Sequence, residues 1–396
     1  MMQIGLPAPS AGETSRVAVG NGEFDPAGVI GSTGSHMYLL ARSGSEPDLR
    51  WWFVGIEVRN GSPLFAPVDL GSSARPPRCF LNGHEAIVCL YDDYTKATAY
   101  IIDAGNGQLT YNGPSEVRLA PGELTATQAG SYLVASTPDQ GVFGVGPQAQ
   151  TTWFVPGNGS LSGTTNYDLA AQSNANPSIE SMTVFNLADG SPLHLDIPDG
   201  ARVESVVMLS DGLAAEIATG QSAAETYLFD STGRRTSADP VSGKILSIAG
   251  DLLIIGNDGD QWSVLTEQGE RLLQINEPPP HGSRRVGANL FVNESDQSQF
   301  PSWRRFDLKS GRESPGPTCD FDMGRRLLGT HGDIAVLAVT NPKAGYLAKA
   351  WNLTTCEPVW SLPSAVDSLA RLWQIDGVLV ALSADGTELY ALDGRG

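Results

Sequence analysis

The stretch LYALDGRG, residues 389–396, contains a pattern that is typical of one fold: a short apolar strand followed by Asp393 and Gly394. Successive residues of a strand point to opposite faces, so Leu389 and Tyr390 lie on different faces and both faces carry apolar groups. A strand that is buried between two neighbouring sheets has this requirement. The aspartate and the glycine supply the side-chain-to-backbone hydrogen bond and the positive φ of a tight turn.

Eight further copies of this motif precede it in the chain. Glycine takes the turn position in eight of the nine copies and Cys356 takes it in one, at intervals of 31 to 52 residues with a mean near 42. A unit of about 40–45 residues with four short strands corresponds to one blade of a β-propeller. The eight copies read VGIEVRNGSPLF at 54–65, AYIIDAGNGQLTY at 99–111, TWFVPGNGSL at 152–161, TVFNLADGSPLHL at 183–195, YLFDSTGRR at 227–235, WSVLTEQGERLL at 262–273, WRRFDLKSGRE at 303–313 and AWNLTTCEPVW at 350–360.

A second apolar segment precedes most copies and predicts another strand of the same blade. We expect these strands to be the inner ones and to line the central channel. They lie at 37–41, 86–90, 132–135, 252–255, 334–339 and 378–382.

The sequence therefore predicts an all-β protein that consists of a single β-propeller of four-stranded blades. We expect about eight blades, with seven or nine as alternatives, because the last copy stops at Gly394, before its outer strands. A strand near residues 16–19 would complete that blade and close the ring, which otherwise leaves a sheet edge exposed. The predicted propeller domain spans 16–396 and follows a flexible segment at 1–15.

Composition agrees with many short strands and tight turns. The 396 residues include 45 glycines and 26 prolines, while only 17% are charged and 41% are hydrophobic, which excludes a coiled coil or a long helical array. Lysine and arginine number 25 against 44 acidic residues, so the net charge is −19. Phosphate backbones and anionic membrane surfaces are repelled on average, and we expect no nucleic-acid partner.

The four cysteines, Cys79, Cys89, Cys319 and Cys356, form no CxxC pair and argue against a zinc site. We expect two structural disulfides, with four buried free thiols as the alternative, and the spacing leaves the pairing open. Asn82-Gly83 predicts a two-residue hairpin turn, which would place Cys79 opposite Ala86 instead of Cys89.

The cysteines and the lack of recognisable targeting segments bear on the cellular compartment of the protein. No run of about 18 apolar residues exists, and the first thirty residues lack the pattern of a signal peptide. The disulfides favour an exported protein, periplasmic or on the outer face of the cytoplasmic membrane, held by an N-terminal anchor that this chain lacks. A cytosolic protein is the alternative.

The motifs LYALDGRG, AYIIDAGNGQL and VGIEVRNGSPLF resemble the repeats of quinoprotein-type propellers, whose enzymes hold pyrroloquinoline quinone. The resemblance covers about residues 37–396 and implies the propeller fold. Those enzymes use adjacent cysteines, a calcium ion and a catalytic aspartate. Here no two cysteines are neighbours, and the acidic clusters at 92–93, 257–260 and 320–322 lack the spacing of a calcium loop. We therefore expect no cofactor and no metal.

A narrower resemblance concerns the paired cysteines in an arginine-rich, lysine-poor propeller. These features are similar to exported propellers of actinobacterial envelopes, some of which are associated with envelope lipid trafficking, including mycolate glycolipids. The resemblance implies a role in envelope lipid transport, although no local motif selects a lipid.

Catalytic motifs are absent from the sequence. The serines of residues 159–163 do not stand at the nucleophile position of Gly-x-Ser-x-Gly. Gly243-Lys244 is not part of a phosphate-binding loop. The five histidines lie far apart and no two have the spacing of metal ligands. We expect no enzymatic activity.

Two side-chain groups are candidate binding residues. Arginine doublets at 234–235, 284–285, 304–305 and 325–326 predict either surface charges paired with acidic neighbours or an anion-binding strip that includes Arg284, Arg304 and Arg325. Among the aromatics, Trp51, Trp153 and Trp303 are candidates for a rim surface that binds sugars or a protein, with burial in the core as the alternative.

The leading functional hypothesis is a non-enzymatic binding or scaffolding propeller of the cell envelope. It would support lipid or glycolipid transport and envelope assembly through protein contacts, with an envelope membrane protein or a glycolipid as partner, and we expect a monomer. The alternative is an enzyme centred on the channel, either a degenerate quinone-dependent dehydrogenase or a carbohydrate-active enzyme.

Overall fold

A computed structural model provides the structure of the chain. The residues that it describes are 16–18, 23–45, 49–93, 95–162, 168–175, 181–220, 225–237, 239–257, 260–293, 303–314, 327–331, 333–338, 345–363, 369–383 and 385–392.

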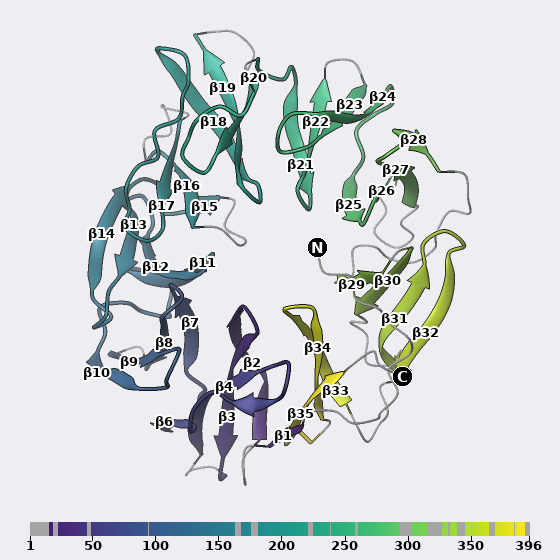
Figure 1. Ribbon diagram of the computed structural model, residues 1–396. Coiled ribbons are helices and arrows are strands. Elements are labelled where there is room, and N and C mark those ends of the chain that lie inside the picture. Colours follow the sequence, from purple (N-terminus) through teal and green to yellow (C-terminus); the bar gives the residue numbers. More distant parts are fainter. Residues whose placement is uncertain are drawn as a thin grey trace.

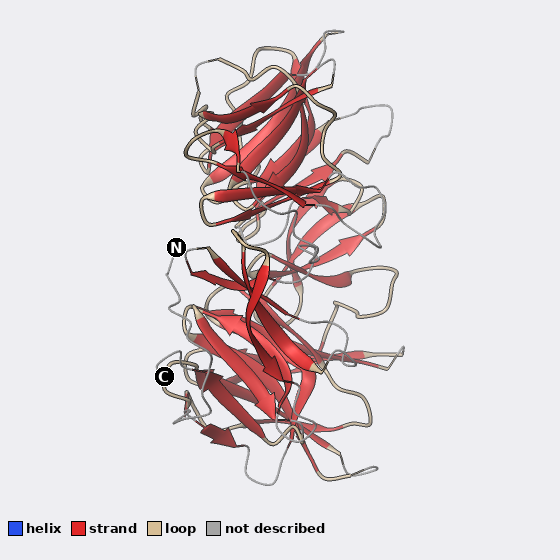
Figure 2. Cartoon of the chain, turned by 90° about the vertical axis from the view of Figure 1, so that its right-hand side faces the viewer, coloured by secondary structure: helices blue, strands red, loops and turns tan. Residues whose placement is uncertain are grey.

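The described residues form nine antiparallel sheets arranged in a ring around a central opening (Figure 1), and a view from the side shows the depth of the ring (Figure 2). We number the sheets as blades 1 to 9 in chain order. The ring thus contains nine blades, at the upper limit of the expected range, and the expectation of eight is wrong. None of the described segments is an apolar helix of membrane-spanning length.

The strands of the first five blades have these bounds. Blade 1 contains β2 (Glu23–Thr33), β3 (His36–Ser43), β4 (Arg50–Glu57), β5 (Ser62–Pro63) and β6 (Val68–Ser72); blade 2 contains β7 (Arg78–Asn82), β8 (Ala86–Asp92), β9 (Ala97–Asp103) and β10 (Leu109–Pro114); blade 3 contains β11 (Thr125–Ala129), β12 (Tyr132–Thr137), β13 (Gly141–Val145) and β14 (Thr151–Pro156); blade 4 contains β15 (Leu161–Ser162), β16 (Leu169–Ser173) and β17 (Met182–Asn186); blade 5 contains β18 (Ala201–Met208), β19 (Gly212–Thr219) and β20 (Glu225–Asp230).

The remaining four blades follow the same plan. Blade 6 contains β21 (Lys244–Ala249), β22 (Leu252–Asn257), β23 (Gln261–Leu265) and β24 (Arg271–Ile275); blade 7 contains β25 (Gly282–Val286), β26 (Asn289–Asn293), β27 (Trp303–Asp307) and β28 (Arg312–Glu313); blade 8 contains β29 (Leu327–His331), β30 (Ile334–Ala338), β31 (Tyr346–Asn352) and β32 (Glu357–Pro363); blade 9 contains β33 (Leu369–Ile375), β34 (Val378–Ser383), β35 (Glu388–Leu392) and the N-terminal β1 (Arg16–Ala18).

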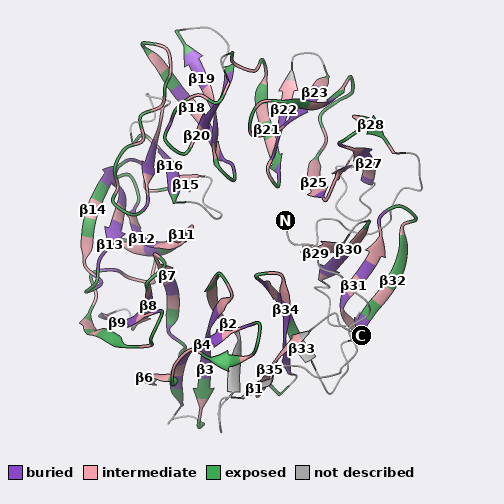
Figure 3. Cartoon of the chain, viewed as in Figure 1, coloured by how far each residue is buried: buried purple, intermediate pink, exposed green. Residues whose placement is uncertain are grey.

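The second strand of each blade pairs with a strand on either side. In β8, residues 87–90 are completely buried, and second strands such as β19 and β30 are coloured as buried in Figure 3. In β21, the first strand of blade 6, Leu246 and Ile248 are 43% and 38% exposed. The expectation that the second strands line the channel is therefore wrong, because strands such as β21 and β25 stand between them and the opening (Figure 1).

Hydrophobic clusters between adjacent blades make up the core. In β9, Ile101 packs in a cluster shared with blade 3, whereas Ile102 packs in one shared with blade 1. This arrangement confirms that the third strand of a blade buries apolar residues on both faces. Each blade is therefore stabilised through its two neighbours.

One copy of the sequence motif was assigned to the wrong strand. The strand of this copy, residues 152–156, belongs to β14, the fourth strand of blade 3, whereas the equivalent third strand is β13. The turn after β13 places Ala149 at a φ of 55°, the left-handed conformation that glycine has in other copies, with its N–H donating to the Gly146 carbonyl (3.0 Å). Replacing position 159 by 149 converts the irregular intervals of 52 and 31 residues into 42 and 41. The repeat is thus more regular in structure than in sequence.

Ring closure occurs where an N-terminal strand was expected. β1 pairs antiparallel with β35, so that Arg16, Val17 and Ala18 face Tyr390, Leu389 and Glu388. The last blade is therefore assembled from both ends of the described chain, and β1 covers the edge of β35.

A disulfide joins β7 to β8, because Cys79 and Cys89 are direct cross-strand partners. The expected two-residue turn at Asn82-Gly83 is wrong: Asn82 pairs with Ala86, and residues 83–85 form a longer loop. The N–H of Gly83 donates to the carbonyl of Ser131 in blade 3 (2.8 Å), so this glycine makes a contact between blades instead of closing the hairpin. Cys356 is also disulfide-bonded, and Cys319 lies outside the described residues.

The turn glycines allow a test of packing between blades 1 and 2. A Cβ at Gly107, where φ is 73°, would come within 2.4 Å of the Phe65 ring, whereas a Cβ at Gly200, where φ is 74°, meets nothing within 4 Å. We predict that Gly107→Ala lowers the free energy of unfolding by about 2–4 kcal/mol and Gly200→Ala by about 1–2 kcal/mol, measured by chemical denaturation. Equal losses would show that Phe65 contributes nothing to the difference.

Removal of β1 tests the closure of the ring. A chain that starts at residue 19 leaves the β35 edge open, and we expect a loss of about 1–3 kcal/mol together with faster aggregation on heating. A chain that starts at residue 16 is the control and should match the full chain in thermal unfolding and light scattering. Identical behaviour of both truncated chains would show that β1 does not stabilise the propeller.

Candidate binding cleft between blades 1 and 2

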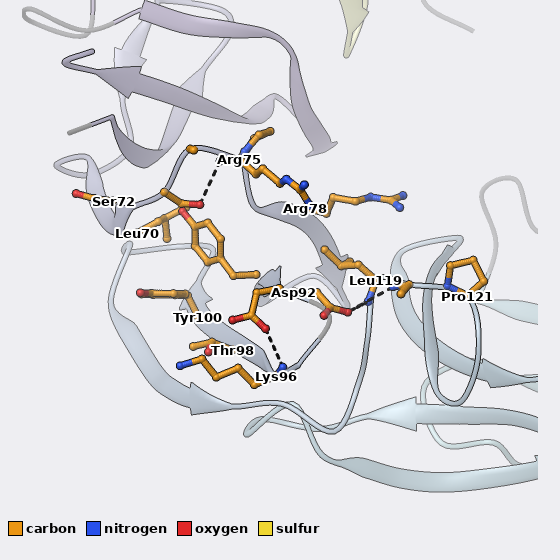
Figure 4. Close-up of a pocket in the computed structure, with 16 residues that line it drawn as sticks. Leu70, Ser72, Arg75, Arg78, Asp92, Lys96, Thr98, Tyr100, Leu119 and Pro121 are labelled. Atoms are coloured by element: carbon orange, nitrogen blue, oxygen red, sulfur yellow. Dashed lines mark hydrogen bonds between the residues drawn. The ribbon is translucent and has the colours of Figure 1, made fainter. Parts of the chain in front are cut away.

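A cleft of about 940 Å³ lies where blades 1 and 2 meet (Figure 4). Three segments form its walls: the end of β6 with the following connection, the β8–β9 turn with its flanking strands, and the connection from blade 2 to blade 3. Its lining residues include Leu70, Ser72, Arg75, Arg78, Tyr91, Asp92, Asp93, Lys96, Thr98, Tyr100, Leu119 and Pro121. This volume suits a ligand with the size of a small organic molecule or a short peptide.

One wall is held by an ion pair at the end of β8. The Asp92 side chain is only 3% exposed and accepts two hydrogen bonds from the Arg118 guanidinium, at 2.7 and 3.1 Å. The backbone N–H of Leu119 also donates to Asp92 (2.9 Å). Hydrogen bonding to Asp92 and its charge raise the pKa of Arg118, so the pair stays ionised. The connection to blade 3 is thereby fixed to blade 2.

The second carboxylate, Asp93, serves its own turn. The Thr95 hydroxyl donates to it (2.6 Å), and together with the backbone N–H groups of Lys96 and Thr95 it lowers the pKa of Asp93 to about 2. The carboxylate is therefore charged and already hydrogen-bonded. It is an acceptor for the turn, and not one half of an acid–base pair.

Two tyrosines supply an aromatic surface inside the cleft. Tyr91 and Tyr100 contact each other edge to face, with ring centroids 5.8 Å apart. The Tyr91 hydroxyl is buried and has no hydrogen-bond partner among the described residues. Burial, together with the nearby Tyr100 and Asp69, raises the pKa of Tyr91, so its hydroxyl stays protonated and is an unused donor.

Two exposed cations lie at the cleft without an ion pair in the described part of the chain. The Arg78 guanidinium lies 5.5 Å from the centre of the Phe80 ring, and Lys96 projects from the β8–β9 turn on the opposite wall (Figure 4). Arg118 neutralises Asp92, and the charge of Lys96 helps to lower the pKa of Asp93, the other carboxylate in the described lining of the cleft. The cleft is therefore locally more positive than a chain of net charge −19.

The arginines predicted from the sequence lie elsewhere. The Arg304 guanidinium pairs with Glu313 (2.7 Å) and Glu277 (2.6 Å), and it lowers the pKa of Glu313. It thus makes the contacts with acidic neighbours that the alternative interpretation of the doublets predicts. Arg284 lies half-buried on β25, two strands from Arg304, and Arg325 lies outside the described residues. The described residues bring no strip of arginines together.

The tryptophans predicted to form a rim surface are packing residues. Trp51 is 3% exposed and donates its indole N–H to the Ser73 carbonyl (2.8 Å), while Trp303 is 6% exposed in the core between blades 7 and 8. The prediction that Trp51 and Trp303 form a rim surface is therefore wrong, because strands buried between blades pack their large side chains into the core. Trp153 is half-buried at a smaller cavity of about 490 Å³, where its indole lies against Gly144 and Gly190.

The residues of the cleft were not found by sequence reasoning, except for Asp92 and Asp93, which were noted as an acidic cluster without the spacing of a calcium loop. Arg78, Tyr91, Lys96 and Tyr100 form no motif, and they converge only because β7, β8 and β9 pair in one sheet. Lys96 is one of only 5 lysines in the chain, the single weak signal that was available.

The channel itself offers a third cavity, of about 370 Å³, between hairpin tips and strands of blades 6 to 9. Its carboxylate, Asp251, forms an ion pair with Arg285. Among the described residues, no group of three histidine, cysteine, aspartate or glutamate side chains has the arrangement of a metal site.

The unpartnered hydroxyl of Tyr91 generates a stability prediction. Tyr91→Phe removes a buried donor without losing a described hydrogen bond, so we expect the free energy of unfolding to rise by about 1 kcal/mol. Tyr38→Phe is the matched control: its hydroxyl donates to the Ala104 carbonyl (3.2 Å), and its loss should cost about 1 kcal/mol. Equal destabilisation by both changes, measured by urea unfolding, would contradict the assignment of Tyr91.

The chain is similar to known proteins in sequence and in structure. An uncharacterized protein of Mycolicibacterium smegmatis (strain MKD8) is 30% identical over 383 residues, which cover 92% of this chain and 78% of the relative. Among solved structures, BamB from Moraxella catarrhalis is 13% identical with a TM-score of 0.36, covering 96% of this chain and 97% of BamB. A eukaryotic initiation factor is 12% identical with a TM-score of 0.44, covering 91% and 98%. At these TM-scores the two structures support no functional argument.

A family match covers nearly the whole sequence. Residues 1–394 match the family described as a conjugation-associated 9-bladed beta-propeller domain, and the nine sheets of the structure agree with that blade number. The chain therefore belongs to the conjugation-associated nine-bladed β-propeller family.

Proposed function

We propose that the chain is a non-catalytic binding and scaffolding module of the cell envelope, which docks a protein of a conjugation-associated assembly in the cleft between blades 1 and 2. The cleft carries this proposal, because it combines a large volume, an aromatic surface and two cations without ion pairs among the described residues. The description of the family supports the link to conjugation.

The charge of the chain argues that its role is to bind proteins and not the transferred DNA. With 44 acidic and 25 basic residues, the long-range field repels a phosphate backbone. A short segment of a protein, in contrast, responds to the local charge of the cleft. The chain would then act beside the DNA path, as a platform for other proteins.

An envelope location is supported by the disulfides. The Cys79–Cys89 bond and the disulfide-bonded Cys356 are typical of oxidising compartments. In this proposal, any contribution to lipid or glycolipid transport is indirect and passes through contacts with envelope proteins. The quinoprotein-type character of the repeats and their similarity to actinobacterial envelope propellers remain part of the same proposal.

The competing function is an enzyme centred on the channel. The channel cavity contains Asp251, but its ion pair with Arg285 neutralises the carboxylate. General acid–base catalysis by two carboxylates needs a second acid in reach, and Asp251 is the only acid that lines this cavity in the described part of the chain. The proposal therefore favours binding over catalysis.

A gene-deletion experiment in conjugating cells tests the function. We expect deletion to lower the frequency of DNA transfer, and the wild-type gene to restore it. Arg78→Glu with Lys96→Glu should fail to restore transfer, because it reverses the charge of the cleft. Lys309→Glu with Arg312→Glu, which changes the net charge equally at exposed positions of blade 7, should restore it.

Three outcomes would count against the proposal. Unchanged transfer after deletion contradicts the link to conjugation, and full restoration by the cleft variant contradicts docking in the cleft. If Asp251→Asn abolishes transfer at normal protein abundance while the cleft variant restores it, a channel-centred enzyme is favoured. Immunoblots of the envelope fraction establish the abundance of each variant.

A further inference from the structure

We infer that the cleft between blades 1 and 2 recognises a short peptide segment that carries a carboxylate next to an aromatic or aliphatic side chain. This inference rests on the proposed function, since it names the chemistry of the partner that the cleft would dock. It is argued from the charge, the aromatic surface and the rigidity of the cleft.

Charge selects a carboxylate for the ligand. Arg78 and Lys96 stand on opposite walls, and neither forms an ion pair within the described ranges. The acids of the cleft are already used: Arg118 binds Asp92, and the Thr95 hydroxyl and backbone N–H groups bind Asp93. An anionic group that enters between the two walls therefore meets two cations that form no ion pair in the described lining, although the charge of Lys96 also acts on Asp93.

The apolar part of the lining selects the rest of the ligand. Leu70, Tyr91, Tyr100, Leu119 and Pro121 line the cleft together with the cations. A free inorganic anion would leave this surface uncovered, whereas an aromatic or aliphatic side chain beside the carboxylate would bury it. The volume of about 940 Å³ accommodates several residues of an extended peptide.

The long-range field excludes larger polyanions. A membrane with anionic lipids or a nucleic acid presents many negative charges, and each is repelled by a chain of net charge −19. A peptide with one or two carboxylates experiences mainly the local field of Arg78 and Lys96. The same chemistry occurs at a free C-terminus and at an internal aspartate or glutamate, so the test separates these two sources.

The walls are preformed for such a ligand. The Cys79–Cys89 disulfide ties β7, which begins at Arg78, to β8, which carries Tyr91. The Asp92–Arg118 pair fixes the opposite connection with Leu119. Little ordering is then needed on binding, which favours measurable affinity for a short segment.

Binding of synthetic peptides to the purified full chain tests the inference, independently of any effect on conjugation. The probes are fluorescent octapeptides that carry two Glu among Phe and Gly residues (Glu/Phe), two Glu among Ser and Gly residues (Glu/Ser), or two Lys among Phe and Gly residues (Lys/Phe), and the first is made with a free and with an amidated C-terminus. Fluorescence anisotropy should show binding of the Glu/Phe peptide and at least about tenfold weaker binding of the other two compositions. Equal affinity of the free and amidated forms assigns recognition to side-chain carboxylates, and loss on amidation assigns it to the C-terminus.

Variants of the cleft establish where the peptide binds. Arg78→Gln with Lys96→Gln should weaken the Glu/Phe peptide by at least about tenfold, whereas Lys309→Gln with Arg312→Gln should leave its affinity unchanged. Thermal unfolding checks that both variants are folded. The inference is overturned if the Glu/Phe peptide does not bind at about 1 mM, if Glu/Ser or Lys/Phe binds equally well, or if the cleft variant binds normally. If the peptides do not bind but the cleft variant still fails to restore DNA transfer, the inferred peptide chemistry is wrong and the proposed function is still supported.

Discussion

Burial of both faces of each blade between its two neighbours is the constraint on which this structure depends. A sheet with two apolar faces has no stable place in water unless a further sheet covers each face, and a closed ring meets that requirement for every blade at once. Ile101 and Ile102, adjacent on β9, pack toward different blades and illustrate the principle in two residues. Closure then needs the last sheet to be completed, which β1 does beside β35.

The same constraint explains where a binding site arises. The apolar side chains of the second and third strands fill the space between adjacent blades, so no room is left for a ligand at that level. Farther along the interface of blades 1 and 2, the walls are a short outer strand, a turn and two connections, whose side chains are larger and more polar. Here the Asp92–Arg118 pair fixes the connection to blade 3, the Cys79–Cys89 disulfide ties β7 to β8, and the cleft lies beside them.

The candidate site was harder to predict than the fold, and particular residues show why. The arginine doublets drew attention because they are visible in the sequence, yet Arg304 is engaged by Glu277 and Glu313. Trp51 and Trp303 were candidates because large aromatics often form binding surfaces, yet both lie in the core. Whether a side chain forms an ion pair or is buried depends on which strand lies next to it. That neighbouring strand can be tens of residues away in the sequence.

The repeat, the all-β class, the propeller architecture and the turn chemistry could be predicted from the amino acids alone, because strand alternation and a positive-φ turn residue are local properties of a few adjacent residues. The sequence left the number of blades open, and it misplaced one repeat because Ala149 adopts the turn conformation without being a glycine. Only the tertiary structure decided the pairing of Cys79 with Cys89, the position of the second strands behind the channel wall, and the meeting of Arg78, Tyr91 and Lys96 in one cleft. These features arise from contacts between strands and between blades, whose geometry is set by the packing of the whole ring and not by any single segment.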